Sequence, residues 1–208
     1  MAVVCYLNEK GGVLKSSLSR ALAVECARNG MSVRLADMDY TQQSTSEWAA
    51  ARTSAGIEPA IKVAVHKDAK AALEWGKGHL LIVDGPAHAS DATIALGKAA
   101  TLVVVPTGCS SEDLVPSVKV LNSLRKEGVP DERVLVVLTR VMSDAQEEKA
   151  RKWLEPGRYR VAPGHIPDLV SFQNVAYGTA LSEIVGRPAL KQAIHNVLDA
   201  ILDAIPEE

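Results

Sequence analysis

Cysteines are few in this sequence, and long apolar runs are missing. The 208 residues include three cysteines, Cys5, Cys26 and Cys109, and no two of them form a closely spaced pair. Disulfide frameworks, zinc sites and iron–sulfur sites use paired cysteines, so we expect reduced, buried thiols instead. No apolar run approaches the ~18 residues of a membrane span, and no basic leader precedes the first one. We therefore expect a cytoplasmic protein.

A strong charge of either sign is also missing. The formal net charge is -2 and the sequence pI is near 6.2, so any contact with nucleic acid must come from a local basic patch. Hydrophobic residues make up 47% and charged residues 23%, which excludes a disordered chain. The length is close to that of one domain, and we expect a single domain over residues 1–208 without a separate DNA-reading module.

The sequence does contain a regular alternation of short apolar runs and longer helical patterns. The expected strands cover residues 3–7, 32–36, 61–65, 80–83, 101–105 and 133–138. Helical patterns cover residues 15–28, run from Ser110 or Ser111 to Gly128, and begin again at Pro188. This alternation predicts an α/β fold, a doubly wound and mostly parallel sheet with helices on both faces, as a three-layer sandwich.

The last helical pattern fits two kinds of helix. From Pro188 its apolar residues fall on one stripe, as in a helix that packs on a core or one that lies on a membrane surface. A membrane-surface helix carries Lys and Arg on its polar face, whereas this one carries Asp199 and Asp203. We therefore expect core packing and no membrane contact.

A glycine-rich segment joins the first expected strand to the first helix. Residues 8–17 read Asn-Glu-Lys-Gly-Gly-Val-Leu-Lys-Ser-Ser, the order of a P-loop, in which backbone N–H groups and a helix N-terminus hold phosphates. Lys15 then bridges the outer phosphates, and the Ser16 hydroxyl holds Mg²⁺. The expected nucleotide contacts are Gly11, Gly12, Val13, Leu14, Lys15, Ser16 and Ser17. The fold predicted from the alternation is thus that of a P-loop NTPase.

The segment resembles the deviant Walker A motif of the ParA/MinD family, in which an additional lysine, here Lys10, precedes the glycine pair. The chain resembles most the small plasmid partition ParA proteins without an N-terminal DNA-binding domain, from Val3 to about Glu183. The resemblance implies an ATPase that uses ATP and Mg²⁺, forms a homodimer when ATP binds, and places Lys10 at the nucleotide of the partner subunit. It also implies nonspecific DNA binding, a nucleoid-associated location and a small centromere-binding, ParB-like partner that stimulates hydrolysis.

One position departs from the family pattern, because Leu14 stands where the family has glycine before the P-loop lysine. We expect a tight turn with positive φ there, which costs a bulky residue about 1–3 kcal/mol. If all of that cost opposed binding, nucleotide affinity would fall about ten- to a hundredfold. Two functions therefore stay open, a partition ATPase and a nucleotide-binding-deficient ParA-fold adaptor that positions DNA.

Three carboxylates follow expected strands. Asp37 and Asp39 come after the second strand and Asp84 after the fourth, at the carboxyl edge where open α/β sheets bind ligands. Asp84 matches the Walker B position that holds Mg²⁺ through a water. The family resemblance implies that Asp39 takes the hydrolytic role and Asp37 supports the metal, although Tyr40 and Thr41 replace the family's Pro-Gln. The alternative for Asp39 is a turn residue that caps the next helix.

Two further groups complete the candidate site. Pro106 and Thr139 follow the fifth and sixth strands, where this fold lines the base pocket, so they are candidates for adenine contacts or simple turn residues. The candidates for DNA contact are basic residues late in the chain: Lys149, Arg151, Lys152, Arg158, Arg160 and Arg187. Phosphate contacts need only surface positive charge, but a solvated helix face balanced by nearby glutamates explains the same pattern.

Relatives with other chemistry fit the sequence less well. A nitrogenase-reductase-like electron carrier needs paired cysteines at its dimer interface, and these are missing. A dethiobiotin-type synthetase needs a substrate pocket, and no residues of such a pocket can be identified. A membrane-bound division-site relative is disfavoured by the acidic face of the last helix.

Overall fold

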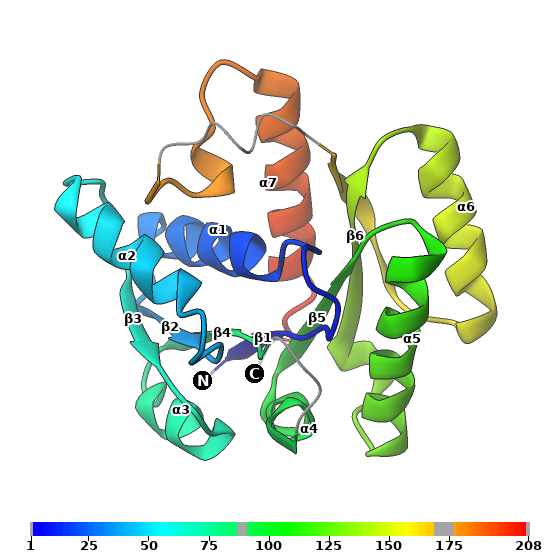
Figure 1. The fold of residues 1–208 in the computed structure, drawn as a ribbon, viewed down its shortest axis with the longest axis horizontal. Helices are drawn as coiled ribbons and strands as arrows, with labels where there is room; N and C mark the ends of the chain where they lie inside the picture. The colour runs from blue at the N-terminus through cyan, green and yellow to red at the C-terminus, as the bar shows by residue number, and fades with distance from the viewer. Residues whose placement is uncertain (1, 87–90, 169–176, 207–208) are drawn as a thin grey trace.

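The computed structural model describes residues 2–86, 91–168 and 177–206 (Figure 1). Its strands are β1 (Val3–Tyr6), β2 (Val33–Asp37), β3 (Lys62–Val65), β4 (Leu80–Asp84), β5 (Leu102–Thr107), β6 (Val134–Val141) and β7 (Val161–Pro167). Its α-helices are α1 (Lys15–Arg28), α2 (Ser44–Ser54), α3 (Ala69–Trp75), α4 (Asp91–Ala99), α5 (Ser111–Lys126), α6 (Asp144–Leu154) and α7 (Pro188–Leu202). Short 3-10 helices are η1 (Asp131–Arg133), η2 (Glu155–Gly157) and η4 (Leu181–Glu183).

The strands form one seven-stranded sheet in which every pair of neighbours is parallel. The order β3-β2-β4-β1-β5-β6-β7 places β1 between β4 and β5. The chain therefore runs from β1 to one edge, returns beside β1 at β4, and then continues to the other edge. This is the doubly wound arrangement that the sequence predicts, and its carboxyl edge beside β1 is where such sheets bind ligands.

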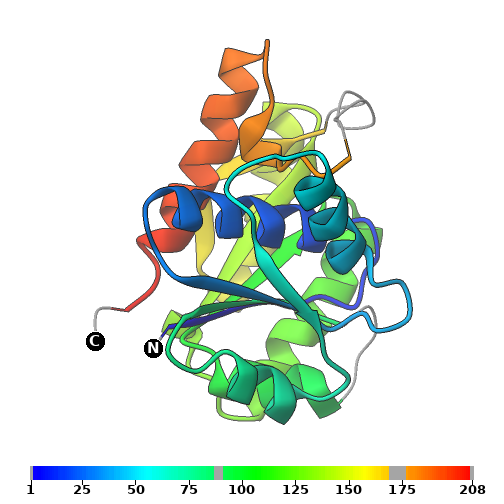
Figure 2. The same ribbon diagram turned by 90° about the vertical axis from the view of Figure 1, so that its left-hand side faces the viewer.

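Helices cover both faces of the sheet (Figures 1 and 2). One core cluster lies between the sheet and α1, α2 and α7, and a second lies between the sheet and α3, α4, α5 and α6. Val4 and Tyr6 of β1 belong to the first cluster, and Val3 and Cys5 belong to the second, because successive side chains of a strand face opposite sides. The predicted three-layer sandwich is confirmed.

The strand predictions differ from the structure mainly at the carboxyl edge. The strands β2, β4, β5 and β6 continue beyond their predicted ends, because backbone pairing does not require an apolar side chain. The prediction missed β7, whose sequence Val-Ala-Pro-Gly-His-Ile-Pro contains residues that are rare inside strands. These residues are tolerated because β7 lies at the edge of the sheet and pairs on one side, with β6.

The last helix packs as predicted. The apolar stripe of α7 is buried, with the side chains of Leu190, Ile194, Val197, Leu198 and Ile201 in the first core cluster. None of the helices in residues 2–86, 91–168 and 177–206 has both the length and the apolar character needed to cross a bilayer. The three cysteines are unpaired, but Cys109 is partly exposed, so the expectation of buried thiols is wrong for that residue.

Candidate functional site

The loop between β1 and α1 leaves a run of backbone donors free. Gly12 has φ 76° and Leu14 has φ 66°, which bends the chain around the helix start. In the described structure the N–H groups of residues 11–17 have no acceptor, and the first bonded amide is that of Leu18, which donates to the Leu14 carbonyl at 2.9 Å. Unpaired amides at a helix N-terminus favour an anion. The loop therefore has the form of a phosphate-binding site.

Asn8 holds the start of this loop in place. Its Nδ2 donates to the Pro106 carbonyl at 2.7 Å and to Ser117 Oγ at 2.8 Å, while its Oδ1 accepts from the Lys10 N–H at 2.9 Å. Asn8 is only 2% exposed, so these bonds are shielded from water. Sequence reasoning gave Asn8 no role, because its partners are about a hundred residues away in the chain.

Pro106 of β5 and Thr139 of β6 form hydrogen bonds that hold the loop in place. Thr139 Oγ1 donates to the Val13 carbonyl at 3.3 Å, and the Pro106 carbonyl accepts from Asn8. Both residues are buried, Thr139 completely. Thr139 has no exposed surface, which favours its alternative role as a structural residue, and the adenine contacts of both residues stay a prediction.

Leu14 has the left-handed backbone expected at its position. Its φ of 66° and ψ of 24° confirm the predicted positive φ. Its side chain packs against the first core cluster. Because core packing fixes this conformation, its strain reduces folding stability. The expected ten- to hundredfold loss of nucleotide affinity stays a prediction.

The two lysines of the loop have different surroundings. Lys15 is the first residue of α1; burial lowers its pKa, while the charges of Asp84 and Asp39 act in the opposite direction. The charges of two of the predicted carboxylates thus act on Lys15, although Lys15 forms no ion pair with any described residue. Lys10 forms no ion pair with any described residue. Its ammonium group is free to meet a ligand or another subunit.

Asp37 anchors α2. Its Oδ2 accepts from the N–H groups of Thr45 and Ser46 at 3.1 Å and 3.0 Å, and its Oδ1 accepts from the Asp39 N–H at 3.0 Å. Burial raises the pKa of Asp37, and these backbone bonds oppose that rise. The residue has no exposed surface. These bonds give Asp37 a structural role at the start of α2, and its support of the metal stays a prediction.

Asp84 has one oxygen bonded and one without a partner. Its Oδ2 accepts from Thr45 Oγ1 at 2.6 Å, whereas its Oδ1 is buried without a hydrogen-bond partner among the described residues. Burial raises the pKa of Asp84, and the hydroxyls of Thr45 and Ser16 oppose that rise. A buried carboxylate oxygen without a partner needs an external donor or cation.

These residues fit a magnesium ion, which binds oxygen ligands and keeps several of its waters. Ser16 would hold the ion directly and Asp84 Oδ1 would accept from one of its waters. No group of three or more His, Cys, Asp or Glu in the described part of the chain could hold a metal by itself. The ion would therefore depend on oxygens of a bound phosphate ligand.

Asp39 lines a cavity at the carboxyl edge. The cavity has a volume of about 640 Å³ and is also lined by Tyr40, Lys67 and Pro86. Asp39 Oδ1 accepts from the Gln42 N–H at 3.0 Å, which stabilises the turn before α2. The alternative role of Asp39 as a turn residue thus stays open beside the hydrolytic one, although it is Asp37 that bonds the first amides of α2.

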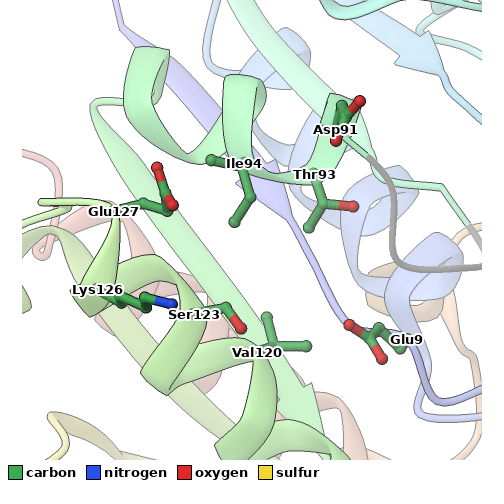
Figure 3. A pocket seen from close by; sticks show the side chains of 8 residues that line it. All are labelled: Glu9, Asp91, Thr93, Ile94, Val120, Ser123, Lys126 and Glu127. Carbon is green, nitrogen blue, oxygen red and sulfur yellow. The ribbon is translucent and has the colours of Figure 1, made fainter.

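A second cavity of about 400 Å³ lies between α4 and α5. Figure 3 shows Glu9 at one end and Glu127 at the other. Glu127 is paired with Lys98 at 2.7 Å, while Glu9 continues directly into the loop. The cavity thus adjoins the candidate phosphate site on the side of the sheet away from α1.

The basic residues proposed for DNA contact do not form one surface. Lys149, Arg151 and Lys152 lie on α6, where Arg151 and Lys152 pair with Glu147 and Glu148 at 2.7 Å and 2.6 Å. The other three stand at opposite ends of β7: Arg158 and Arg160 precede it, and Arg187 lines a cavity with Pro167 at its end. A continuous patch from all six residues is therefore not present.

Known proteins share this sequence pattern and fold. Residues 4–180 match the family model of the CobQ/CobB/MinD/ParA nucleotide binding domain, CbiA. No curated protein gives a significant sequence match.

Solved structures match nearly the whole chain. A chain of the MinC:MinD cell division protein complex from Aquifex aeolicus has a TM-score of 0.75 at 15% identity, covering 100% of this chain and 98% of that one. A protein named for plasmid partition from Borrelia burgdorferi B31, bound to AMPPNP, has a TM-score of 0.72 at 16% identity, covering 98% and 99%. The septum site-determining protein MinD from Pyrococcus horikoshii OT3, complexed with Mg-ADP, has a TM-score of 0.73 at 17% identity, covering 95% of this chain and 94% of that one. Identities this low establish a shared fold.

Proposed function

The chain belongs to the CobQ/CobB/MinD/ParA family of nucleotide-binding domains, and from this premise we propose that it is a partition ATPase. In this proposal residues 1–208 act as one ATPase domain that binds ATP with Mg²⁺ and dimerises on ATP. The dimer binds DNA without sequence preference, and a small ParB-like, centromere-binding partner stimulates hydrolysis.

One observation carries the nucleotide part of the proposal. The amides of residues 11–17 have no acceptor in the described structure, and Lys15 and the buried Asp84 lie beside them. Amides and a lysine match the charge of a triphosphate, while a carboxylate without a partner matches a hydrated cation. A magnesium-bound polyphosphate accounts for both groups at one helix N-terminus.

Each residue then has a task in hydrolysis. Bound Mg²⁺ neutralises charge that develops on the transferring phosphoryl group. Lys15 and the amides of the loop hold the phosphates, Ser16 and Asp84 hold the ion, and Asp39 orients the attacking water. Lys10, which has no ion-pair partner in the described residues, adds positive charge at the nucleotide of the facing subunit.

The choice of partition over cell division rests on α7. Its apolar stripe is buried in the core, which leaves no apolar face of this helix for a membrane. DNA contact would come from the exposed basic residues at one edge of the sheet. Arg158 and Arg160, which precede the edge strand β7, or Arg187, which lies near its other end, are the candidates.

Sedimentation with plasmid DNA tests the complete proposal. We expect the protein to sediment with DNA when ATP is present, more weakly with ADP or without nucleotide, and less as salt rises, because phosphate contacts release counterions. An interaction that ignores both salt and nucleotide, or none at all, would exclude a DNA-bound ATPase.

A nucleotide-independent adaptor is the second candidate, and Leu14 is the observation in its favour. Isothermal titration of ATP into this chain and into the Leu14→Gly variant separates the two functions. Micromolar binding by the unmodified chain would exclude the adaptor. Absence of binding by both proteins would exclude the ATPase.

A further inference from the structure

A chain of hydrogen bonds runs from α1 through the start of α2 to the end of β4. Arg20 Nε donates to Thr45 Oγ1 at 2.9 Å, and Thr45 Oγ1 donates to Asp84 Oδ2 at 2.6 Å. The direction is unambiguous, because a guanidinium group has no acceptor and a hydroxyl has a single hydrogen. The Thr45 hydroxyl therefore donates a hydrogen bond to the Asp84 carboxylate and accepts one from the Arg20 guanidinium.

Thr45 is fixed from a second side as well. Its N–H donates to Asp37 Oδ2 at 3.1 Å, and the residue has no exposed surface. Asp37 and Asp84 are aligned in register across β2 and β4. Thr45 thus lies between two strand ends, and neither its backbone nor its hydroxyl can move without breaking a buried bond.

Arg20 is held by two further contacts. Its Nη2 donates to Ser44 Oγ at 2.9 Å, and its guanidinium lies over the Trp48 ring, 5.7 Å from the centroid. Burial lowers the pKa of Arg20, and the charges of Asp84 and Asp37 act against this. Arg20 thus adds a cation to the site beyond the two loop lysines. This cation contacts the start of α2.

The consequence for Asp84 is orientation. Its Oδ2 is bonded to Thr45 Oγ1, which restricts rotation of the carboxylate. Its Oδ1 is left without a partner in the described structure. The partners of a metal-binding carboxylate set its direction and its basicity, and their loss typically weakens metal affinity about 10–100-fold.

We propose that Arg20 and Thr45 are positioning residues that orient Asp84 for magnesium, an inference that rests on the ATPase function proposed above. Thr45 holds Oδ2 so that Oδ1 accepts from a water of the ion, and Arg20 keeps the Thr45 hydroxyl pointed at Asp84. Since Thr45 belongs to the first turn of α2, a shift of residues 39–44 changes the direction of Asp84. The hydrolytic Asp39 and the metal site are then coupled through one hydroxyl.

Magnesium dependence of ADP binding tests this directly. We would titrate ADP into the unmodified chain, Thr45→Val and Thr45→Ser, each with Mg²⁺ and with EDTA. Thr45→Val keeps the shape but removes the hydroxyl, so its gain in affinity from Mg²⁺ should fall about tenfold. Its affinity in EDTA should stay within about twofold. Thr45→Ser restores the donor and should retain the gain.

Two further variants keep the test decisive. Thr53→Val is the matched control, because the Thr53 hydroxyl bonds the Ala49 carbonyl of its own helix and lies outside the site; it should behave like the unmodified chain. Arg20→Met should reduce the magnesium gain in the same way and provides the answer if Thr45→Val does not fold. A full gain in ADP affinity from Mg²⁺ in Thr45→Val would overturn the positioning role alone. If Thr45→Val does not fold, the same result in Arg20→Met would do so. Absence of ADP binding by every protein would overturn the ATPase function together with it.

Discussion

Arg52 and Glu183 form a buried ion pair that joins α2 to the C-terminal part of the chain. Arg52 Nη1 lies 2.7 Å from Glu183 Oε2, with exposed side-chain fractions of 0% and 8%. The same guanidinium donates to the carbonyls of Pro59, Gly178 and Glu58. The helix whose first turn contacts Asp37 and Asp84 is therefore anchored at its other end by a charge pair.

Glu183→Ala should destabilise the protein by about 3 kcal/mol, because it leaves a buried guanidinium without its counter-charge. Urea unfolding measures this free energy. Glu148→Ala is the matched control: Glu148 pairs with Lys152 at the surface, so its loss should cost less than about 1 kcal/mol. Equal losses of unfolding free energy in the two variants would show that the buried Arg52–Glu183 pair stabilises the protein no more than a surface pair does.

The contribution of Glu183 should depend on pH. Burial alone would raise the pKa of Glu183, but hydrogen bonds from Arg52 and the Ala180 N–H, with the charges of Arg52 and Arg28, hold it below its ordinary value of 4.5. The unfolded chain then binds protons first as pH falls, so the stabilisation is present above that value and is lost through the folded pKa. The stability difference between the unmodified chain and Glu183→Gln should shrink between about pH 7 and about pH 3. A constant difference in urea unfolding would contradict the lowered pKa.

At residue 14, glycine should be more stabilising than alanine. A left-handed backbone costs a residue with a Cβ about 1–2 kcal/mol. The free energy of unfolding of Leu14→Gly in urea should therefore be about 1 kcal/mol higher than that of Leu14→Ala. Both variants lose the leucine packing, so the comparison isolates the backbone. At the exposed α2 position, Ala50→Gly should instead lose about 1 kcal/mol. Alanine equal to or better than glycine at residue 14 would show that its φ is not positive.

The sequence predicted the loop, the strand ends with Asp37 and Asp84, and the positive φ at Leu14, because each depends on local spacing and on the order of strands and helices. It did not predict β7, whose Pro163 and Gly164 are tolerated by its edge position. The roles of Asn8 and Thr45 were also missed, since most of their partners come from strands and helices that only the fold brings near. Local patterns thus predict candidate ligand-facing residues, but not the residues that hold them.

Asn8→Asp should weaken both folding and nucleotide binding. The change replaces a buried donor with a charged acceptor that faces the Pro106 carbonyl, so we expect a loss of at least about 2 kcal/mol in unfolding free energy. Asn122→Asp is the control, because Asn122 is exposed and its Oδ1 only accepts, from the Tyr159 hydroxyl; its effect should stay within about 0.5 kcal/mol. Similar losses for both would mean that the Asn8 bonds do not support the loop.

The two lysines of the loop should separate nucleotide binding from dimerisation. Lys15 begins α1 at the candidate phosphate site and in our proposal holds the phosphates of its own subunit, so Lys15→Ala should reduce ADP affinity at least about tenfold. Lys10 has no ion-pair partner in the described residues, so Lys10→Ala should leave ADP affinity within about twofold but abolish ATP-dependent dimers in sedimentation velocity. Lys119→Ala, a change on the exposed face of α5, is the control and should alter neither. Loss of ADP binding in Lys10→Ala would place that lysine at the nucleotide of its own subunit and would remove the facing-subunit role.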